Sequence, residues 1–237
     1  MLLAGILLMA KPALADSYYP YEIQGYDVTV KVGKDNVYHV TERLQVNFNQ
    51  ARHGIYRDIP VINNVSREDG STSRIQARVT NIKTYGEKRT VGREGSYCRI
   101  RLGDENKTLV GEHMYHISYD YNMGKDVRKG EDEFYYNIIG TSWDTTIQNV
   151  TFHIMMPEDI DESKVGMAYG ESGSTNNEGL QYTINGKVME GYVDSSIILN
   201  PGEAVTVRMV LPDGYYDQVK QRIWPALISI LLSLAAA

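Results

Sequence analysis

Two histidines and several carboxylates are the residues of this sequence whose types could do chemistry. His113 and His116 are three positions apart, a spacing that places two metal ligands on one side of a helix. However, apolar residues alternate through this segment at Tyr115, Ile117 and Tyr119, which predicts a strand. Residues three apart in a strand point to opposite faces of the sheet. The sequence therefore predicts no metal shared by the two histidines.

The carboxylates suggest hydrolysis by residue type alone. Asp58, Asp104 and Asp144 could act as acid and base on a glycan, but that chemistry needs two carboxyl groups roughly 5–10 Å apart in a cleft, and the spacing selects no pair. The acidic run 131–133 lacks the spaced ligands and turn glycine of a calcium loop, which favours a solvated hairpin tip. No serine elbow, glycine-rich phosphate loop or HExxH motif occurs. We predict no catalytic residue, metal or cofactor.

One thiol and one indole complete the chemical candidates. Cys98 is the single cysteine, so no disulfide framework forms within the chain. It alternates with Ile100 and Leu102, which favours an inward-facing small hydrophobe over a nucleophile. Trp143 could offer a sugar a stacking platform on an exposed loop. A plug in the core or between two sheets is the favoured interpretation.

The elements that position these residues are predicted to be strands. The chain has 18 Tyr against 3 Phe and 2 Trp, and Tyr favours half-buried pleated surfaces. Apolar residues recur at every second position in several segments, among them 26–32, 38–48, 115–121, 150–156 and 205–209. Turn signals between them, such as 33–36 and Asn185-Gly186, separate these runs. Residues 22–212 are therefore predicted to form an all-β domain, an antiparallel β-sandwich.

Apolar segments lie at both ends of the sequence. An apolar run at 2–10 is followed by Ala13-Leu14-Ala15, which predicts a signal peptide over 1–15 that is cleaved before Asp16. Residues 223–237 carry no charge, and Trp224 stands where an interfacial aromatic anchor belongs. A span needs about 20 residues, so we interpret 223–237 as a partial transmembrane helix after a juxtamembrane linker at 213–222. An interfacial helix is the alternative.

One carboxylate is predicted to lie in the core. Glu42 falls between Val40 and Leu44 on the apolar parity of its strand, and a buried carboxylate is costly unless it is paired. Arg57 is the nearest plausible partner in sequence, and its guanidinium can grip a carboxylate with two hydrogen bonds. We predict a buried Glu42–Arg57 ion pair. The alternatives are a bulge that turns Glu42 outward and an Arg57 that faces solvent to bind a partner.

Arg57 lies in the most distinctive stretch of the sequence, the residues HGIYRDIP at 53–60. The same order contains VTE at 40–42, NIIGTSW at 137–143, IQNV at 147–150, LNPGEA at 199–204 and LPDG at 211–214. In that order, these motifs resemble the YciQ-like family of predicted bacterial membrane proteins over residues 22 to 214. The resemblance implies a signal peptide, a β-rich extracytoplasmic domain of unknown function, and membrane spans after it. It implies no chemistry.

Two functions from different classes remain open. The first is a membrane-anchored extracytoplasmic binding or assembly module of the bacterial cell envelope, located at the cell membrane, with an envelope protein or a glycan as partner. The second is an envelope hydrolase that uses carboxylates, on a glycan. The net charge of −6 and the lack of a basic run exclude nucleic acid as a partner. The candidate structural or interaction residues are Glu42, His53, Tyr56, Arg57, Asp58 and Trp143.

Overall fold

The computed structural model describes residues 19–66, 70, 72–125 and 130–220. The segments interpreted above as a signal peptide, at 1–15, and as a partial transmembrane helix, at 223–237, lie outside these described residues. Within the described ranges, no helix is both long enough and apolar enough to cross a membrane.

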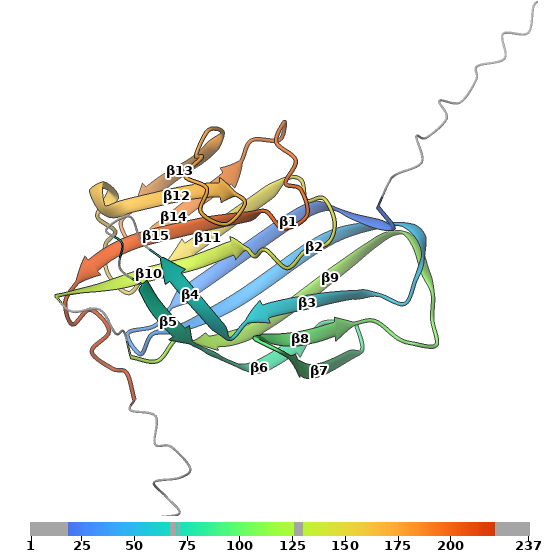
Figure 1. Cartoon of the computed structure of the whole chain (residues 1–237), viewed down its shortest axis with the longest axis horizontal. Coiled ribbons are helices and arrows are strands. Elements are labelled where there is room, and N and C mark those ends of the chain that lie inside the picture. Colours follow the sequence, from blue (N-terminus) through green and yellow to red (C-terminus); the bar gives the residue numbers. More distant parts are fainter. Residues whose placement is uncertain (1–18, 67–69, 71, 126–129, 221–237) are drawn as a thin grey trace, which may run out of the picture.

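The larger layer is a seven-stranded sheet that runs the length of the domain (Figure 1). Its strands, in spatial order, are β13 (Leu180–Asn185), β14 (Val188–Val193), β11 (Val150–Met155), β1 (Tyr21–Val32), β2 (Val37–Arg52), β9 (Leu109–Asn122) and β6 (Arg78–Thr84). β1 and β2 are joined through the predicted turn, where the Asn36 N–H donates to the carbonyl of Gly33 at 3.0 Å. The Asn185-Gly186 signal likewise joins β13 to β14.

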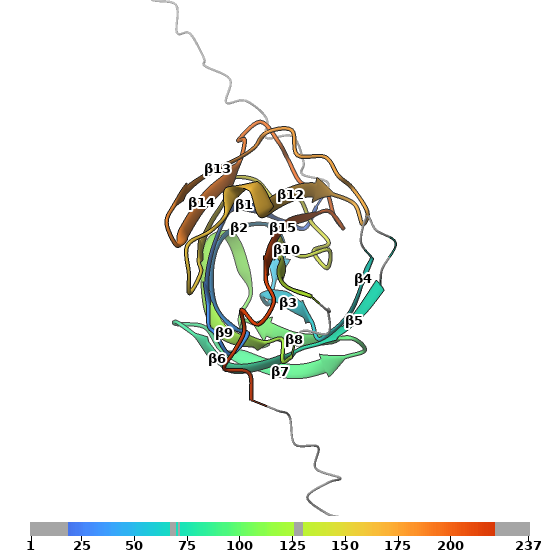
Figure 2. The same ribbon diagram turned by 90° about the vertical axis from the view of Figure 1, so that its left-hand side faces the viewer.

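Two three-stranded sheets form the second layer. One has the order β10 (Glu131–Ile139), β15 (Ala204–Pro212) and β12 (Val165–Gly170), and the other has the order β3 (Ile55–Pro60), β8 (Tyr97–Leu102) and β7 (Arg89–Glu94). The hairpin of β4 (Ile62–Ser66) and β5 (Thr72–Gln76) forms a further sheet, and the 3-10 turn η1 spans Glu162–Lys164. Seen end-on, the large sheet curves around β10 and β15 (Figure 2).

The core lies between the two layers and is rich in tyrosine. The ring of Tyr38 on β2 lies 5.1 Å from that of Phe134 and 5.8 Å from that of Tyr136, both on β10. The buried residues of β2 are the even-numbered ones from Tyr38 to Phe48, as the alternation predicts. The prediction of a mostly β-strand domain is thus confirmed.

The prediction of a purely antiparallel sandwich is wrong at one strand pair. β1 and β11 are parallel, with Tyr26 opposite Val150 and Val30 opposite Ile154. Parallel neighbours need a long connection, and β11 is reached only after β2 to β10 have been built. Side-chain alternation is the same for both strand directions, so the sequence pattern does not reveal this pairing.

Candidate functional site

A fully buried carboxylate lies at the centre of the core. The Glu42 side chain is 0% exposed and that of Arg57, which reaches it from β3, is 2% exposed. Arg57 Nε donates to Glu42 Oε2 and Arg57 Nη2 donates to Glu42 Oε1, both at 2.8 Å. The predicted two-point ion pair is therefore present. It joins β2 of the large sheet to β3 of the smaller sheet.

Two tyrosine hydroxyls complete the surroundings of the carboxylate. Tyr26 on β1 donates to Glu42 Oε2 at 2.8 Å, and Tyr119 on β9 donates to Glu42 Oε1 at 2.6 Å. The Tyr136 hydroxyl, on β10, lies 3.0 Å from the Tyr119 hydroxyl. Glu42 thus accepts four hydrogen bonds, two from a cation, which offsets the cost of burying its charge. We call these five residues the Glu42 centre: Tyr26, Glu42, Arg57, Tyr119 and Tyr136.

Trp143 covers the Arg57 side of this centre. Its ring lies 5.7 Å from the guanidinium carbon of Arg57 and meets the ring of Tyr26 edge to face at the same separation. The Trp143 side chain is buried at 3% exposure. The favoured interpretation of Trp143 as a plug is confirmed, and it offers no surface to a sugar.

Proton affinities in the centre favour one charge state. Burial raises the pKa of the Glu42 carboxyl, but the Arg57 charge and the hydrogen bonds from Arg57, Tyr119 and Tyr26 outweigh burial, so this pKa is lowered from its ordinary value. Burial lowers the pKa of Arg57, yet the neighbouring Glu42 charge leaves it well above the ordinary value. Burial raises the pKa of Tyr26 and Tyr119. A carboxyl held ionised in this way is suited to structure, since a general acid needs a raised pKa.

The HGIYRDIP segment divides its side chains between the core and the surface. Ile55, Arg57 and Ile59 point inward and are buried, whereas Tyr56 is 55% exposed. Asp58 faces outward and accepts from Arg99 of β8 in a two-point pair, Nε to Oδ1 at 2.9 Å and Nη2 to Oδ2 at 2.7 Å.

His53 lies just before this strand, at the surface. Its Nδ1 lies 2.9 Å from the carbonyl oxygen of Lys107. The next residue, Gly54, has φ +129° and lies against the end of β8. A Cβ at this position would come within 1.9 Å of the Leu102 carbonyl oxygen. Only glycine fits at that position.

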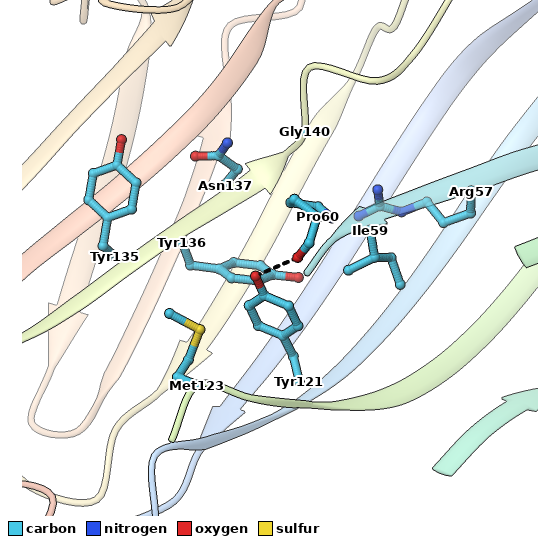
Figure 3. A pocket seen from close by; sticks show the side chains of 9 residues that line it. All are labelled: Arg57, Ile59, Pro60, Tyr121, Met123, Tyr135, Tyr136, Asn137 and Gly140. Atoms are coloured by element: carbon cyan, nitrogen blue, oxygen red, sulfur yellow. Dashed lines mark hydrogen bonds between the residues drawn. The ribbon is translucent and has the colours of Figure 1, made fainter. Parts of the chain in front are cut away.

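A small cavity lies beside Arg57, at the junction of the second-layer sheets (Figure 3). Its volume is about 30 Å³, enough for about two water molecules. The lining includes Pro60 of β3, Tyr121 of β9, Met123 just after β9, and Asn137 of β10. The Tyr121 hydroxyl donates to the Pro60 carbonyl at 2.8 Å, which satisfies part of the free edge of β3. The cavity is too small for an organic ligand of ordinary size.

The other chemical candidates do not converge. Asp104 is paired with Lys88, which with the backbone N–H of Asn106 lowers the pKa of its carboxyl, and Asp144 accepts a hydrogen bond from Tyr21. These partners differ from Arg99, the partner of Asp58. Among the described residues, no group of three or more His, Cys, Asp or Glu side chains is arranged to hold a metal.

The two histidines of β9 face opposite sides of the sheet, as predicted. His113 lies 2.7 Å from Glu87 and packs against Tyr115 of the core, whereas His116 stacks on Tyr85 at the outer face. Cys98 points toward the core but is only partly buried, and burial raises the pKa of its thiol.

The prediction of a solvated acidic hairpin tip is wrong for two of its three residues. Asp132 and Glu133 are buried at 8% and 6% exposure. Asp132 accepts from the backbone N–H of Tyr216 at 3.0 Å, and Glu133 accepts from Arg208 Nε at 2.6 Å. These partners come from β15 and the segment after it. Residues far away in the sequence, rather than the local charge run, therefore determine that Asp132 and Glu133 are buried.

Sequence analysis missed the three tyrosines of the Glu42 centre. Tyr26 and Tyr119 lie on the predicted inward parity, which placed their rings correctly. Their position beside Glu42 depends on register, since Glu42 pairs with Val28 of β1 and with Ile117 of β9. No local signal in the sequence states those registers.

The fold and the Glu42 centre define a two-layered β domain that is held together by a buried polar cluster. Comparison with known families gives its affiliation: the chain belongs to the family described as the N-terminal domain of a predicted membrane protein (DUF2207), whose sequence model matches residues 22–211. It is therefore a domain of a predicted membrane protein of unknown function. No curated protein matches the sequence.

Solved structures with a distant likeness include two hydrolases. The M1 zinc metallopeptidase from Deinococcus radiodurans is 9% identical with a TM-score of 0.41, and the match covers 79% of this chain and 42% of that protein. The native leukotriene A4 hydrolase from Saccharomyces cerevisiae is 7% identical with a TM-score of 0.42, with 84% and 32% covered. The chain spans less than half the length of either protein.

Proposed function

We propose that this chain is a membrane-anchored, extracytoplasmic binding or assembly module of the bacterial cell envelope, and that it is not an enzyme. The proposed anchor is the apolar segment 223–237, and the proposed export signal is 1–15. Within the family shown above, the motifs around HGIYRDIP support a place in the YciQ-like group. The proposal puts the β domain outside the membrane, where an envelope protein or a glycan could reach it.

The observation that carries the binding proposal is the division of HGIYRDIP between two faces. We call the outward side chains of the β3–β8–β7 sheet the Tyr56 face, formed by Tyr56, Asp58, Arg99 and Arg101. Arg99 lies 5.2 Å from the Tyr56 ring centroid while it pairs with Asp58. Exposed tyrosine and arginine are enriched at protein interfaces, where they supply most of the binding energy.

The inward residues of the same strand make this face rigid. Arg57 lies between Tyr56 and Asp58 in sequence and is fixed to Glu42 by two hydrogen bonds. Its Nη1 also donates to the Asp58 carbonyl at 2.8 Å, to which the Ser142 hydroxyl donates at 2.9 Å. Side chains held in place before binding lose less entropy when a partner arrives. The Glu42 centre therefore acts as a positioning element for the Tyr56 face.

The alternative, an envelope hydrolase using carboxylates, receives less support from the geometry. Asp58, Asp104 and Asp144 are held by three different partners, and Glu42 is enclosed with a lowered pKa. A retaining or inverting hydrolase needs two carboxyl groups that face each other across the substrate.

The test is retention of envelope components by the immobilised full chain. We expect a discrete component to be retained by the wild-type chain and lost with the Tyr56→Ala, Arg99→Ala double variant. Tyr192→Ala provides a matched control, because Tyr192 is an exposed tyrosine of β14 in the other layer. Equal retention by all three chains would contradict the proposed surface. Release of sugar from envelope glycan by the purified wild-type chain would instead support the hydrolase.

A further inference from the structure

The outer face of the large sheet carries a second polar cluster, on the side away from the Tyr56 face. Three rows of side chains cross β2, β9 and β6. The rows follow the pairing of β2 with β9: His39 with Asp120, Thr41 with Ser118, and Arg43 with His116. β6 adds Asn81 and Lys83, and Tyr85 directly follows its end. Successive rows are about 7 Å apart, since alternate residues of a strand share a face.

A groove of about 430 Å³ lies over the first two rows. Its lining includes His39, Thr41, Asn81, Lys83, Ser118 and Asp120. This volume is in the range of small-molecule sites, roughly 300–1,000 Å³. The lining side chains alternate hydrogen-bond donors with acceptors and offer no apolar pocket.

Asp120 is held in one orientation by two neighbours. His39 Nδ1 lies 2.6 Å from Asp120 Oδ1, and Asn81 Nδ2 donates to Asp120 Oδ2 at 2.6 Å. Because the histidine uses Nδ1 in this contact, its second ring nitrogen, Nε2, is left to face another group. His39 has a 53% exposed side chain, so that nitrogen is within reach of a ligand.

The backbone of β6 is distorted at the same place. The pairing of β6 with β9 shifts between Thr80 and Lys83, and Asn81 has φ +52°, in the left-handed region that favours glycine. Asparagine tolerates this conformation better than most residues, and here it also directs its amide to Asp120. An outlier whose side chain helps to form a groove suggests a binding role rather than a purely structural one.

The third row lies beside the groove and carries a flat aromatic surface and a cation. Tyr85, 55% exposed, stacks on His116 with ring centroids 4.1 Å apart and planes inclined by 20°. Burial, and secondly the charge of Arg43, lower the pKa of His116, which favours the neutral ring in this stack. Arg43 is 60% exposed, and its Nη1 lies 3.8 Å from Oδ1 of Asp27 on β1, on the side of β2 away from β9 and β6. Lys83 is exposed one row away.

We propose that this groove binds an acidic saccharide. The hydroxyl groups of the sugar meet His39, Asp120, Asn81, Thr41 and Ser118, and its carboxylate meets the Lys83 ammonium. A further sugar ring of the chain lies against Tyr85 in the next row. A peptide would leave apolar side chains with no pocket, whereas a hydroxyl-rich chain matches alternating donors and acceptors. This site is separate from the Tyr56 face, so either proposal can fail without the other.

Calorimetric titration of the full chain tests this proposal, with a tetramer of galacturonic acid and the neutral galactose tetramer as probes. The acidic tetramer is expected to bind at least about tenfold more tightly than the neutral one, which corresponds to 1.4 kcal/mol. Lys83→Gln is expected to remove most of this preference. Tyr85→Ala is expected to weaken both sugars severalfold, and Asn81→Gly to weaken them while keeping the backbone conformation.

Matched controls separate the groove from general surface effects. Lys164→Gln on η1 and Tyr192→Ala on β14 remove an exposed charge and an exposed ring elsewhere, and both are expected to leave the affinities unchanged. Vesicles with and without a glucuronic-acid glycolipid distinguish a lipid-borne saccharide from a soluble one, and binding to either source supports the site. No binding of the acidic tetramer or the glycolipid vesicles, equal affinity for the two tetramers, or equal losses in the control variants would overturn the proposal.

Discussion

The two faces of β2 carry polar residues under opposite conditions. On the inner face, Glu42 is fully buried and accepts hydrogen bonds from three residues. On the outer face, His39 and Arg43 have side chains that are 53% and 60% exposed, and each lies near one carboxylate. Neighbouring residues of the strand therefore differ in their surroundings. The charge of Glu42 must be compensated entirely by protein groups, whereas the charge of Arg43 is largely solvated by water.

This difference decides what each cluster can do. Losing one partner in the Glu42 centre leaves another charge unpaired at low dielectric, so the cluster is fixed and structural. The outer cluster loses little when a partner is removed, because solvent replaces it. Its groups are therefore free to exchange water for a ligand, and this is the physical basis for assigning stability to one face and recognition to the other.

The largest expected effect is on the free energy of unfolding when the central ion pair is broken. Glu42→Gln or Arg57→Met alone should each cost about 3–5 kcal/mol, because the remaining partner stays buried without its counter-charge. The double variant should recover part of that loss. Denaturant titration of the full chain and its three variants gives the coupling energy. Small, additive losses would mean that the pair contributes little to the link between the layers.

A smaller effect is expected from Tyr119 in alkali. Its pKa is raised in the folded protein, so its contribution to stability is fully present below the unfolded pKa of about 10 and is lost as the pH rises above it. The loss should be about 1.4 kcal/mol per pH unit for this one group. Tyr119→Phe should therefore reduce the loss of unfolding free energy between pH 10 and 11 by about 1 kcal/mol, because the unfolded tyrosine is only half ionised at about pH 10. The control is Tyr56→Phe, at an exposed ring, and an equal change in both variants would contradict the assignment.

The smallest effect is expected at the outer pair of His39 and Asp120. Asp120→Asn should change the free energy of unfolding at pH 7 by no more than about 1 kcal/mol, because the partner histidine is half exposed. The same denaturant titration measures this change. A loss comparable to that of Glu42→Gln would remove the contrast between the two faces and would make the outer cluster structural.

The inner face was more predictable than the outer one. Alternation in β2 placed Glu42 in the core, and the cost of an unpaired buried charge required a partner, which proved to be Arg57. The outer cluster left no comparable signal, because polar residues on a solvated face are what any sheet shows. Asn81 is an example: its role depends on a register shift in β6 that no local pattern reveals.

The acidic run at 131–133 is a case in which the local sequence predicted the wrong surroundings. Its composition indicates a solvated tip, yet Asp132 and Glu133 are buried by partners near the end of the domain, Tyr216 and Arg208. Charge patterns report the cost of burial but not the presence of a distant group that offsets it.

The sequence by itself determined the strands, the inward parity of Glu42 and the need for a cation beside it, since these follow from a two-residue period and the desolvation of charge. Only the tertiary structure decided which strands are neighbours. It placed β11 parallel to β1, brought Tyr26 and Tyr119 to one carboxylate with Tyr136 against Tyr119, and aligned His39, Asp120 and Asn81 on the outer face. The reason is that register and strand order come from packing between residues far apart in the chain, whereas alternation is a local property of each strand.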